Sequence, residues 1–232
     1  MGIGAIVVAA QLIGGPPSEV LHPIITEILF AVPTEGGDAN GDGVRDATGD
    51  EFIELVNWSP HPLQMSGYTL TDRHTSGRGQ MKFVFPAFEL PPWGVAVVFN
   101  GRNQTWKGPV GDSTLAPPGP NELFHGAWVF TMRNESEMVG LSNSGDCVVL
   151  WAPTGEAISC VVWGDVKVMP EVPAACVVRV EIPRNGSVQR SRTTGRFQAH
   201  RDLAQGALSL PFSPGRFPWP PEEGAAPGAG SK

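Results

Sequence analysis

The segment at residues 38–57, DANGDGVRDATGDEFIELVN, is the feature that most constrains what this chain can fold into. Its first half places side-chain oxygens at alternating positions, with Gly43 after the third donor. The side-chain donors, in order, are Asp38, Asn40, Asp42 and Asp46. This spacing matches the front of a calcium loop, in which position 7 adds a backbone carbonyl and a glycine makes the sharp turn. The second half, 51–57, is apolar and free of breakers, which indicates a strand.

The loop departs from the helix-loop-helix calcium motif in two ways. Gly49 occupies position 12, where that motif has a bidentate glutamate, and the nearest acids are Asp50 and Glu51. The flanking sequences, IITEILFAVP and EFIELVN, are typical of strands. We therefore expect a calcium site between two strands, and an acidic surface loop without an ion is the alternative. The expected ligands are Asp38, Asn40, Asp42, the carbonyl of Val44, Asp46 and Asp50.

A calcium ion in this loop would have a structural role. The carboxylates of Asp38, Asp42 and Asp46 repel one another at short range, and a cation would relieve that repulsion. Because the loop lacks a bidentate glutamate, we expect an affinity of roughly 10⁻⁴–10⁻³ M, the range of extracellular calcium modules. Such a site would stay empty in a cytosol, so this expectation favours a secreted or cell-surface protein.

Composition and breaker spacing predict an all-β domain. The chain has 29 glycines and 23 prolines in 232 residues, which favours many turns and few long helices. Nothing alternates strand with helix, so we expect one β-sandwich or barrel. Residues 100–135 are expected to form an irregular surface region, and the chain from 187 onward a folded-back tail. The predicted strands are 24–30, 52–56, 68–71, 82–85, 95–99, 146–151, 157–163 and 176–180.

The clearest hairpin pairs 146–151 with 157–163 and determines the environment of two cysteines. Centring the turn on 153–156 places Cys147 opposite Val162 and Cys160 opposite Val149. The two thiols then share a face but sit diagonally, so a disulfide between them would be strained. We expect buried free thiols. With Cys176 as the third cysteine and no CxxC pair, a structural zinc site and a disulfide framework are both disfavoured.

The two ends of the chain differ in composition from its middle. Residues 1–15, MGIGAIVVAAQLIGG, are apolar but too short to span a bilayer as a helix, so we expect no transmembrane span. They resemble the apolar region of a secretory signal without its positive start, and a simple apolar strand is the alternative. We expect an apolar segment and linker at 1–22, the sandwich at 23–217 and a disordered tail at 218–232.

Catalytic motifs are missing from the sequence. The five histidines, at 22, 61, 74, 125 and 200, form no metal-binding spacing, and the chain has no GxSxG, P-loop or GxGxxG motif. The triplet at 111–113, Gly-Asp-Ser, is similar to an esterase nucleophile block but has no downstream histidine motif. We therefore expect no enzymatic activity. A formal charge of −7 and a pI of about 5.2 give no reason to expect nucleic acid as the main partner.

Two sequence features could serve binding. The segment 179–201 carries six arginines, which could contact phosphates or form a solvated basic face. Four tryptophans lie in or next to predicted loops, where they could stack on sugar rings or pack against the core. A calcium-stabilised carbohydrate-binding or adhesive module is therefore an alternative, and coplanar exposed indoles would favour it. These tryptophans are Trp58, Trp93, Trp106 and Trp128.

The order of motifs resembles a lamin tail domain of the bacterial type, which has an immunoglobulin-like fold. The matching pieces span 24–216 and are IITEIL, DANGDG, DEFIELVN, LQMSGYTLTD, FVFP, LPPWGVAVVF, LSNSGDCVVLWAPTGEAI and SVQRSRTTGRFQAH with SPGR. One departure is at Arg192 and Thr193, where the family usually carries an acidic-glycine turn.

This resemblance implies a non-catalytic binding or scaffold module with a protein or cell-surface polysaccharide as partner. Such domains occur in exported bacterial proteins, sometimes fused to hydrolases. An accessory domain related to secreted hydrolases or nucleases is therefore a further alternative.

Overall fold

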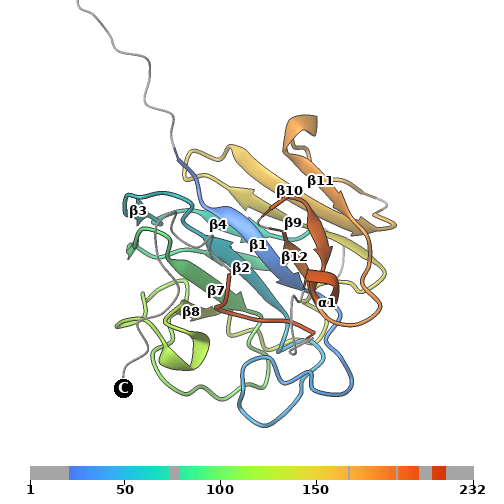
Figure 1. Cartoon of the computed structure of the whole chain (residues 1–232), viewed down its shortest axis with the longest axis horizontal. Coiled ribbons are helices and arrows are strands. Elements are labelled where there is room, and N and C mark those ends of the chain that lie inside the picture. Colours follow the sequence, from blue (N-terminus) through green and yellow to red (C-terminus); the bar gives the residue numbers. More distant parts are fainter. Residues whose placement is uncertain (1–20, 74–78, 167, 192, 204–210, 218–232) are drawn as a thin grey trace, which may run out of the picture.

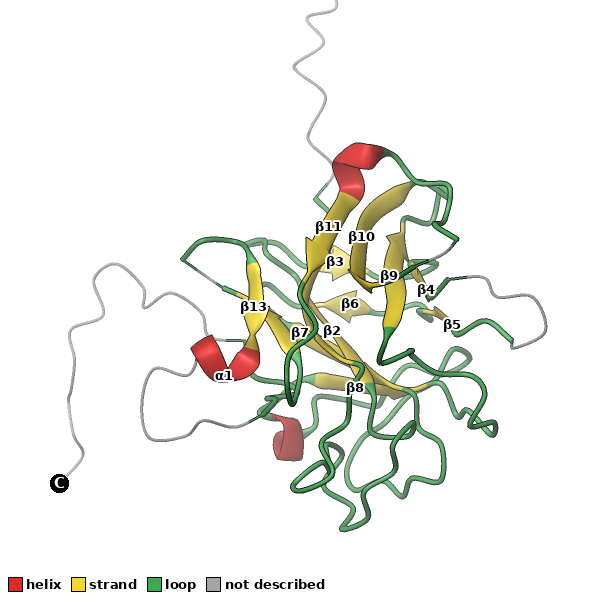
Figure 2. Ribbon diagram, turned by 90° about the vertical axis from the view of Figure 1, so that its right-hand side faces the viewer, coloured by secondary structure: helices red, strands yellow, loops and turns green. Residues whose placement is uncertain are grey.

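The computed structural model describes residues 21–73, 79–166, 168–191, 193–203 and 211–217. The sequence predictions for most of the N-terminal segment, for the 218–232 tail, and for His74 and Arg192 lie outside these residues. Within them, the chain forms two large sheets packed face to face (Figures 1 and 2). This arrangement confirms the predicted all-β, immunoglobulin-like sandwich.

The first sheet has six strands and carries both the 38–50 loop and the last strands of the chain. Adjacent strands in this sheet run antiparallel, except β7 and β8, which run parallel. The spatial order is β13 (Phe197–Ala199), β12 (Val188–Arg190), β1 (Ile24–Leu29), β2 (Phe52–Val56), β7 (Val95–Phe99) and β8 (Trp128–Thr131).

The second sheet has five strands and is antiparallel except at one edge, where β11 runs parallel to β10. Its order is β11 (Val177–Val180), β10 (Ala157–Gly164), β9 (Gly145–Trp151), β4 (Thr69–Thr71) and β5 (Lys82–Val84). The smaller described elements are the strand pair β3 (Leu63–Gln64) and β6 (Glu89–Leu90), the 3₁₀ helices η1 (Glu122–Phe124) and η2 (Ala174–Cys176), and the single-turn helix α1 (His200–Leu203).

The main core lies between the two sheets. Side chains alternate across a strand, so Ile53 and Leu55 of β2 point inward and meet Leu150 and Val161 of the second sheet. Trp163, the largest fully buried side chain among the described residues, stacks on Phe30, with ring centroids 4.2 Å apart and planes 8° from parallel. Burial of these side chains supplies the main stabilisation of the sandwich.

The first sheet is also covered on its outer face. Phe52, Val97 and Phe99 point away from the main core and form a second buried cluster. Phe124 of η1 and Phe217 from the C-terminal segment cover them. All five residues of β7 are therefore buried, as the continuous apolar run at 95–99 predicts for a strand covered on both faces.

The β9–β10 hairpin has the predicted register. Cys147 pairs with Val162 and Cys160 with Val149, so the two thiols are diagonal neighbours. Both cysteines are fully buried, and all three cysteines of the chain are free. The structure therefore confirms the prediction of buried free thiols at these two positions.

Two regions contain more strand than the sequence indicates. The 100–135 region, expected to be irregular, contains β8, which joins the sheet parallel to β7. The tail folds back as predicted and forms β12, which pairs with β1, and β13 beyond it. These strands have three or four residues each, too few for a clear alternating pattern, and pairing with a neighbour gives them their extended conformation. No helix among the described residues is long and apolar enough to cross a membrane.

Candidate functional site

Asp50 closes the 38–50 loop at the point where the chain enters β2. Its Oδ1 accepts hydrogen bonds from the backbone N–H groups of Ala39 (2.8 Å) and Asn40 (3.1 Å). Its Oδ2 accepts one from the N–H of Asp46 (2.7 Å). Burial raises the pKa of Asp50 to about 6, against the lowering effect of these hydrogen bonds. One buried carboxyl group thus joins the beginning and the end of the loop.

The first half of the loop folds around Asp38 and Asp42. Asp38 accepts hydrogen bonds from the N–H groups of Asp42 (3.1 Å) and Gly43 (2.8 Å). Asp42 accepts one from the N–H of Val44 (2.8 Å). Gly43, between Asp42 and Val44, has a φ of 96°, a left-handed conformation that glycine adopts without strain. The glycine therefore has the turning role that the sequence pattern predicts for it.

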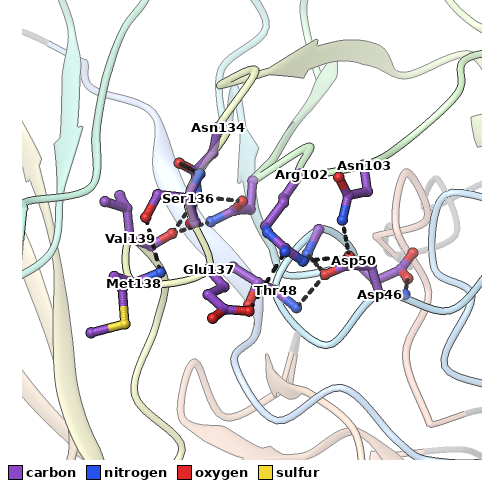
Figure 3. Close-up of polar contacts among 12 residues, drawn as sticks. Asp46, Thr48, Asp50, Arg102, Asn103, Asn134, Ser136, Glu137, Met138 and Val139 are labelled. Carbon is purple, nitrogen blue, oxygen red and sulfur yellow. Dashed lines mark hydrogen bonds and ion pairs between the residues drawn. The ribbon is translucent and has the colours of Figure 1, made fainter.

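Asp46 connects the loop to the segment that follows β7 (Figure 3). Its Oδ1 accepts hydrogen bonds from the N–H groups of Thr48 (2.9 Å) and Gly49 (2.8 Å). Its Oδ2 accepts them from Nη1 of Arg102 (2.9 Å) and Nδ2 of Asn103 (3.1 Å). The second half of the loop is thereby attached to residues more than fifty positions away in the chain.

Both Asp42 and Asp46 favour the ionised form. Partial burial acts to raise the pKa of each, but hydrogen bonds outweigh it. For Asp42 the strongest of these comes from the N–H of Thr105 (2.9 Å), and for Asp46 from that of Gly49. The pKa of each carboxyl group is consequently lowered from its usual value, and each carries a negative charge at neutral pH.

A third loop, after β8, completes this end of the sandwich (Figure 3). Arg102 reaches from Asp46 to the exposed Glu137, with Nη2 3.6 Å from the carboxylate. The Asn134 side chain donates to Ser136 O (2.8 Å) and to Oδ1 of Asn100 (3.0 Å). Three loops that lie far apart in the sequence are therefore held together by polar contacts.

The six predicted calcium ligands lie within this one loop, but the side-chain oxygens of five of them (Asp38, Asn40, Asp42, Asp46 and Asp50) already accept hydrogen bonds. The set of donors suits calcium, which prefers carboxylate, amide and carbonyl oxygens. Within the described residues, however, no three or more His, Cys, Asp or Glu side chains are grouped as metal ligands. Val44, whose carbonyl is the predicted backbone ligand, is 63% exposed. Binding an ion here would require several carboxylates to exchange N–H partners for the cation, and the calcium site stays a prediction.

The four predicted tryptophans fall into two groups. Trp58 is 39% exposed and Trp93 is 44% exposed, and their rings meet edge to face at 6.0 Å and 86°. Trp106 and Trp128 are partly buried, against Phe99 (5.3 Å) and Phe88 (5.3 Å) respectively. The exposed pair is thus nearly perpendicular rather than coplanar.

The Gly-Asp-Ser triplet at 111–113 is part of a turn. Asp112 accepts hydrogen bonds from the hydroxyl (2.7 Å) and N–H (2.7 Å) of Thr114, and these bonds lower its pKa. Its other oxygen lies 2.8 Å from a guanidinium nitrogen of Arg133. The Asp112 carboxylate therefore orders a turn and pairs with an arginine.

The described histidines contact different parts of the molecule. His22 bonds the Tyr68 hydroxyl (2.7 Å) and His200 the Ser213 hydroxyl (2.8 Å), whereas His125 lies 3.3 Å from Arg216. His61 lies at the surface. These placements join none of the described histidines to the aspartate of the 111–113 turn.

Sequence reasoning missed a buried carboxyl pair on the outer face of the first sheet. Glu27 and Glu54 are register partners on β1 and β2, and both are fully buried. Glu54 accepts hydrogen bonds from the Thr26 hydroxyl (2.7 Å) and the Gly215 N–H (2.9 Å). Burial raises the pKa of both glutamates, most clearly that of Glu54. The signal was a glutamate inside each apolar run, IITEIL and FIELV.

A second cluster of buried acidic residues lies at the end of the sandwich that carries the loops. Glu51, Asp72 and Asp146 line a cavity of about 220 Å³. Burial raises the pKa of all three, that of Asp72 to about 8, and the neighbouring Asp146 adds to this rise. Each accepts a backbone N–H, from Leu141, Met81 and Ser142 respectively, at 2.9 Å. These carboxyl groups order the chain around them and retain protons more strongly than exposed acids do.

Comparison with known proteins identifies the family. The model of the Lamin Tail Domain family matches residues 22–165, which is more than half of the chain. The match begins next to β1 and ends just after β10, so the sandwich continues beyond it through β11, β12 and β13. A search of curated proteins found no match. The chain belongs to the lamin tail domain family.

Proposed function

We propose that this chain is a non-catalytic binding or scaffold module of an exported bacterial protein and that it contacts a protein partner through Trp58 and Trp93. The family is immunoglobulin-like and generally non-catalytic, which supports the first half of the proposal. The observation that carries the second half is the exposed, edge-to-face indole pair. Tryptophan is enriched among the residues that dominate protein–protein binding energy.

The backbone at Trp93 supports a role in recognition. The N–H of Gly94 donates to the carbonyl of Pro91 (2.9 Å), which closes a tight turn with Trp93 at its third position. Trp93 has a φ of 60° there, a conformation that normally requires glycine. Such strain in a bulky residue is of order 1–3 kcal/mol and is concentrated at functional sites. The backbone is thus strained at a residue that is 44% exposed.

The geometry of the pair favours a protein over a polysaccharide. Sugar rings stack on the flat faces of aromatic rings, and coplanar indoles would offer them a continuous platform. The planes of Trp58 and Trp93 are 86° apart, and Trp58 is also edge to face with Phe217 (5.9 Å, 73°). Because Phe217 is buried, this contact anchors the exposed pair to the outer core cluster.

A retention assay tests this function. The immobilised full chain is exposed to a bacterial cell-envelope extract, before and after protease treatment of the extract. We expect saturable retention that protease abolishes and that Trp58→Ala with Trp93→Ala weakens at least tenfold. Leu115→Ala is the control because Leu115 is an exposed apolar side chain (61%) of a different loop, the one that bonds Asp112. Retained material that survives protease would support the carbohydrate-binding alternative, and retention unaffected by the tryptophan changes would exclude the indole surface.

Calcium binding by the 38–50 loop is the second part of the proposed function. It is supported by the alternating oxygen donors and by the lowered pKa values of Asp42 and Asp46, which keep both carboxylates charged. A structural ion would join the loop to the start of β2. An affinity of about 10⁻⁴–10⁻³ M is compatible with a protein outside the cytosol.

Thermal unfolding with excess calcium and with EDTA tests the ion. We expect calcium to raise the melting temperature of the natural chain and Asp42→Asn to remove that rise. Glu156→Gln, an exposed change in the β9–β10 turn, should leave it intact. An equal melting temperature in calcium and EDTA would mean that the hydrogen bonds described above order the loop without a metal.

A further inference from the structure

A cleft of about 1000 Å³ is lined by residues of β11 and β13, which belong to different sheets of the sandwich. Val180 of β11 and Phe197 of β13 contribute apolar walls, and Val188 of β12 lies between them. Val180 and Phe197 also pack against the main core, so these walls are continuous with the folded interior. The cleft is thus lined by residues from both sheets.

Both walls of the cleft are sheet edges. β11 is the last strand of one sheet and β13 is the last strand of the other, and each pairs on one side only within the described part of the chain. An edge strand presents N–H and C=O groups to which an extended peptide can add as a further strand. The cleft therefore offers backbone hydrogen bonding beside apolar side chains.

Three arginines at the cleft give it a charge opposite to that of the whole chain. Arg179, Arg184 and Arg201 line it and are exposed. None of them lies within ion-pair distance of a carboxylate in the described residues, although Glu181 and Asp202 line the same cleft. Their guanidinium groups can therefore bind carboxylates in the bidentate geometry that arginine favours.

Arg190 has a different role from the cleft arginines. It is partly buried, donates to the carbonyls of Ile25 (3.0 Å) and Gly195 (2.7 Å), and lies 4.6 Å from the centre of the Phe197 ring. These contacts use its guanidinium group inside the fold and support one wall of the cleft. The basic segment at 179–201 is thus divided between structural and exposed arginines.

We infer that this cleft binds an extended acidic peptide segment of a partner protein, which adds to a sheet edge and pairs its carboxylates with Arg179, Arg184 and Arg201. The unpaired edges favour a peptide over an anionic polysaccharide, because only a peptide can continue the strand hydrogen bonds. This interaction does not depend on the indole pair or on calcium.

Fluorescence polarisation with labelled ten-residue peptides tests the inference on the full chain. The probe alternates glutamate with valine, so one face is acidic and the other apolar. A second probe has lysine in place of glutamate, and a third carries N-methyl groups at alternate positions, which remove strand hydrogen bonds. We expect saturable binding of the first probe alone, weakened by added salt.

The variants separate the cleft from general attraction between charges. Arg179→Gln, Arg184→Gln and Arg201→Gln combined should weaken binding at least tenfold. Arg196→Gln removes an exposed arginine of the same segment that does not line the cleft, and it should leave binding unchanged. Unchanged melting temperatures would show that both variants are folded.

Three outcomes would overturn the inference. One is the absence of saturable binding below 1 mM. Another is equal loss of binding in the triple variant and in Arg196→Gln. The third is equal binding of the N-methylated probe with displacement by dextran sulfate, which would indicate a surface for polyanions rather than for a peptide strand.

Discussion

Asp50 is the most deeply buried aspartate of the 38–50 loop. Its buried carboxyl group accepts three backbone N–H groups, from Ala39, Asn40 and Asp46. Two of these groups stand near the start of the loop and one near its end. This side chain, one position after the predicted twelfth, therefore joins the two ends of the loop.

Replacing Asp50 by alanine should destabilise the protein by about 3 kcal/mol. The change leaves three backbone N–H groups without the fully buried acceptor that they share, and each unsatisfied buried group costs about 1–3 kcal/mol. Urea unfolding measures the effect. Glu35→Ala, an exposed change just before the loop, should stay within about 0.5 kcal/mol of the natural chain. Similar stabilities for the two variants would contradict this role of Asp50.

At the scale of elements, the β9–β10 hairpin keeps two thiols close without joining them. Diagonal neighbours on an antiparallel pair are about 7–8 Å apart at Cα, beyond the usual span of a disulfide. A hydrogen bond with the Cys160 thiol, and then burial, raise the pKa of Cys147. The Cys147 thiol is consequently a poor nucleophile.

We expect three titratable thiols per chain after prolonged exposure to air, measured with a thiol reagent in denaturant. In the folded protein, Cys176 should react first because it is only partly buried. Cys176→Ser should then remove the fast phase of labelling and leave two slow thiols. Recovery of a single thiol from the natural chain would instead demonstrate a Cys147–Cys160 bond.

The C-terminal segment at 211–217 is a second element with a specific requirement. Gly215 has a φ of 84°, and a Cβ at this position would lie 2.2 Å from the carbonyl oxygen of Phe124. Its N–H also donates to the buried Glu54. The close approach of two backbones at this point holds the segment against the outer face of the first sheet.

Gly215→Ala should therefore lower the free energy of unfolding by clearly more than an alanine in the left-handed conformation does where no other atom is close. Gly155 is the matched control, since its φ is 85° and a Cβ added there would have nothing within 4 Å. We expect about 1 kcal/mol for Gly155→Ala and about 3 kcal/mol or more for Gly215→Ala, by urea unfolding. Equal losses of stability in the two variants would show that the 211–217 segment can shift away from Phe124 without destabilising the protein.

At the scale of the whole molecule, buried acids should control the dependence of stability on pH. The pKa values of Glu27, Glu51, Glu54 and Asp72 are all raised, from 4.5 for the glutamates and 3.8 for the aspartate. Above about pH 4.5 the unfolded chain loses protons that the folded chain keeps. The free energy of unfolding must then fall as pH rises, until these groups ionise in the folded state.

We expect the chain to be less stable at pH 8 than at pH 5, because Asp72 has a pKa of about 8 and Glu54 one well above its usual value. The lowered pKa values of Asp42 and Asp46 act only below about 3.8, outside this interval. The lowered pKa of His125 makes stability rise with pH, but His125 is a single, largely exposed group.

Glu54→Gln should reduce this loss of stability. Glutamine can accept from the Gly215 N–H and donate to the Thr26 hydroxyl while carrying no charge at any pH. Urea unfolding at pH 5 and pH 8 measures the change, with Glu156→Gln as the exposed control. A stability that is flat or rising over this interval in the natural chain would contradict the assignment.

Much of the fold follows from local pattern. The apolar run at 95–99 predicts a strand buried on both faces, and the turn at 153–156 sets the register that places Cys147 opposite Val162. Both depend on residues close together in the sequence. In contrast, β8 and β12 are too short to be recognised alone and become strands by pairing with β7 and β1.

The candidate sites divide in the same way. The sequence by itself determined that Asp38 to Asp50 form one oxygen-rich loop before β2, because the spacing of its residues is local. Only the tertiary structure decided that Arg102 and Thr105 contact that loop, and that residues 213–215 cover Glu27 and Glu54. Glu27 and Ser213 are 186 positions apart in the chain. A sequence pattern reports the neighbours along a strand or turn, whereas burial and the resulting pKa shifts depend on the segments that fold over it.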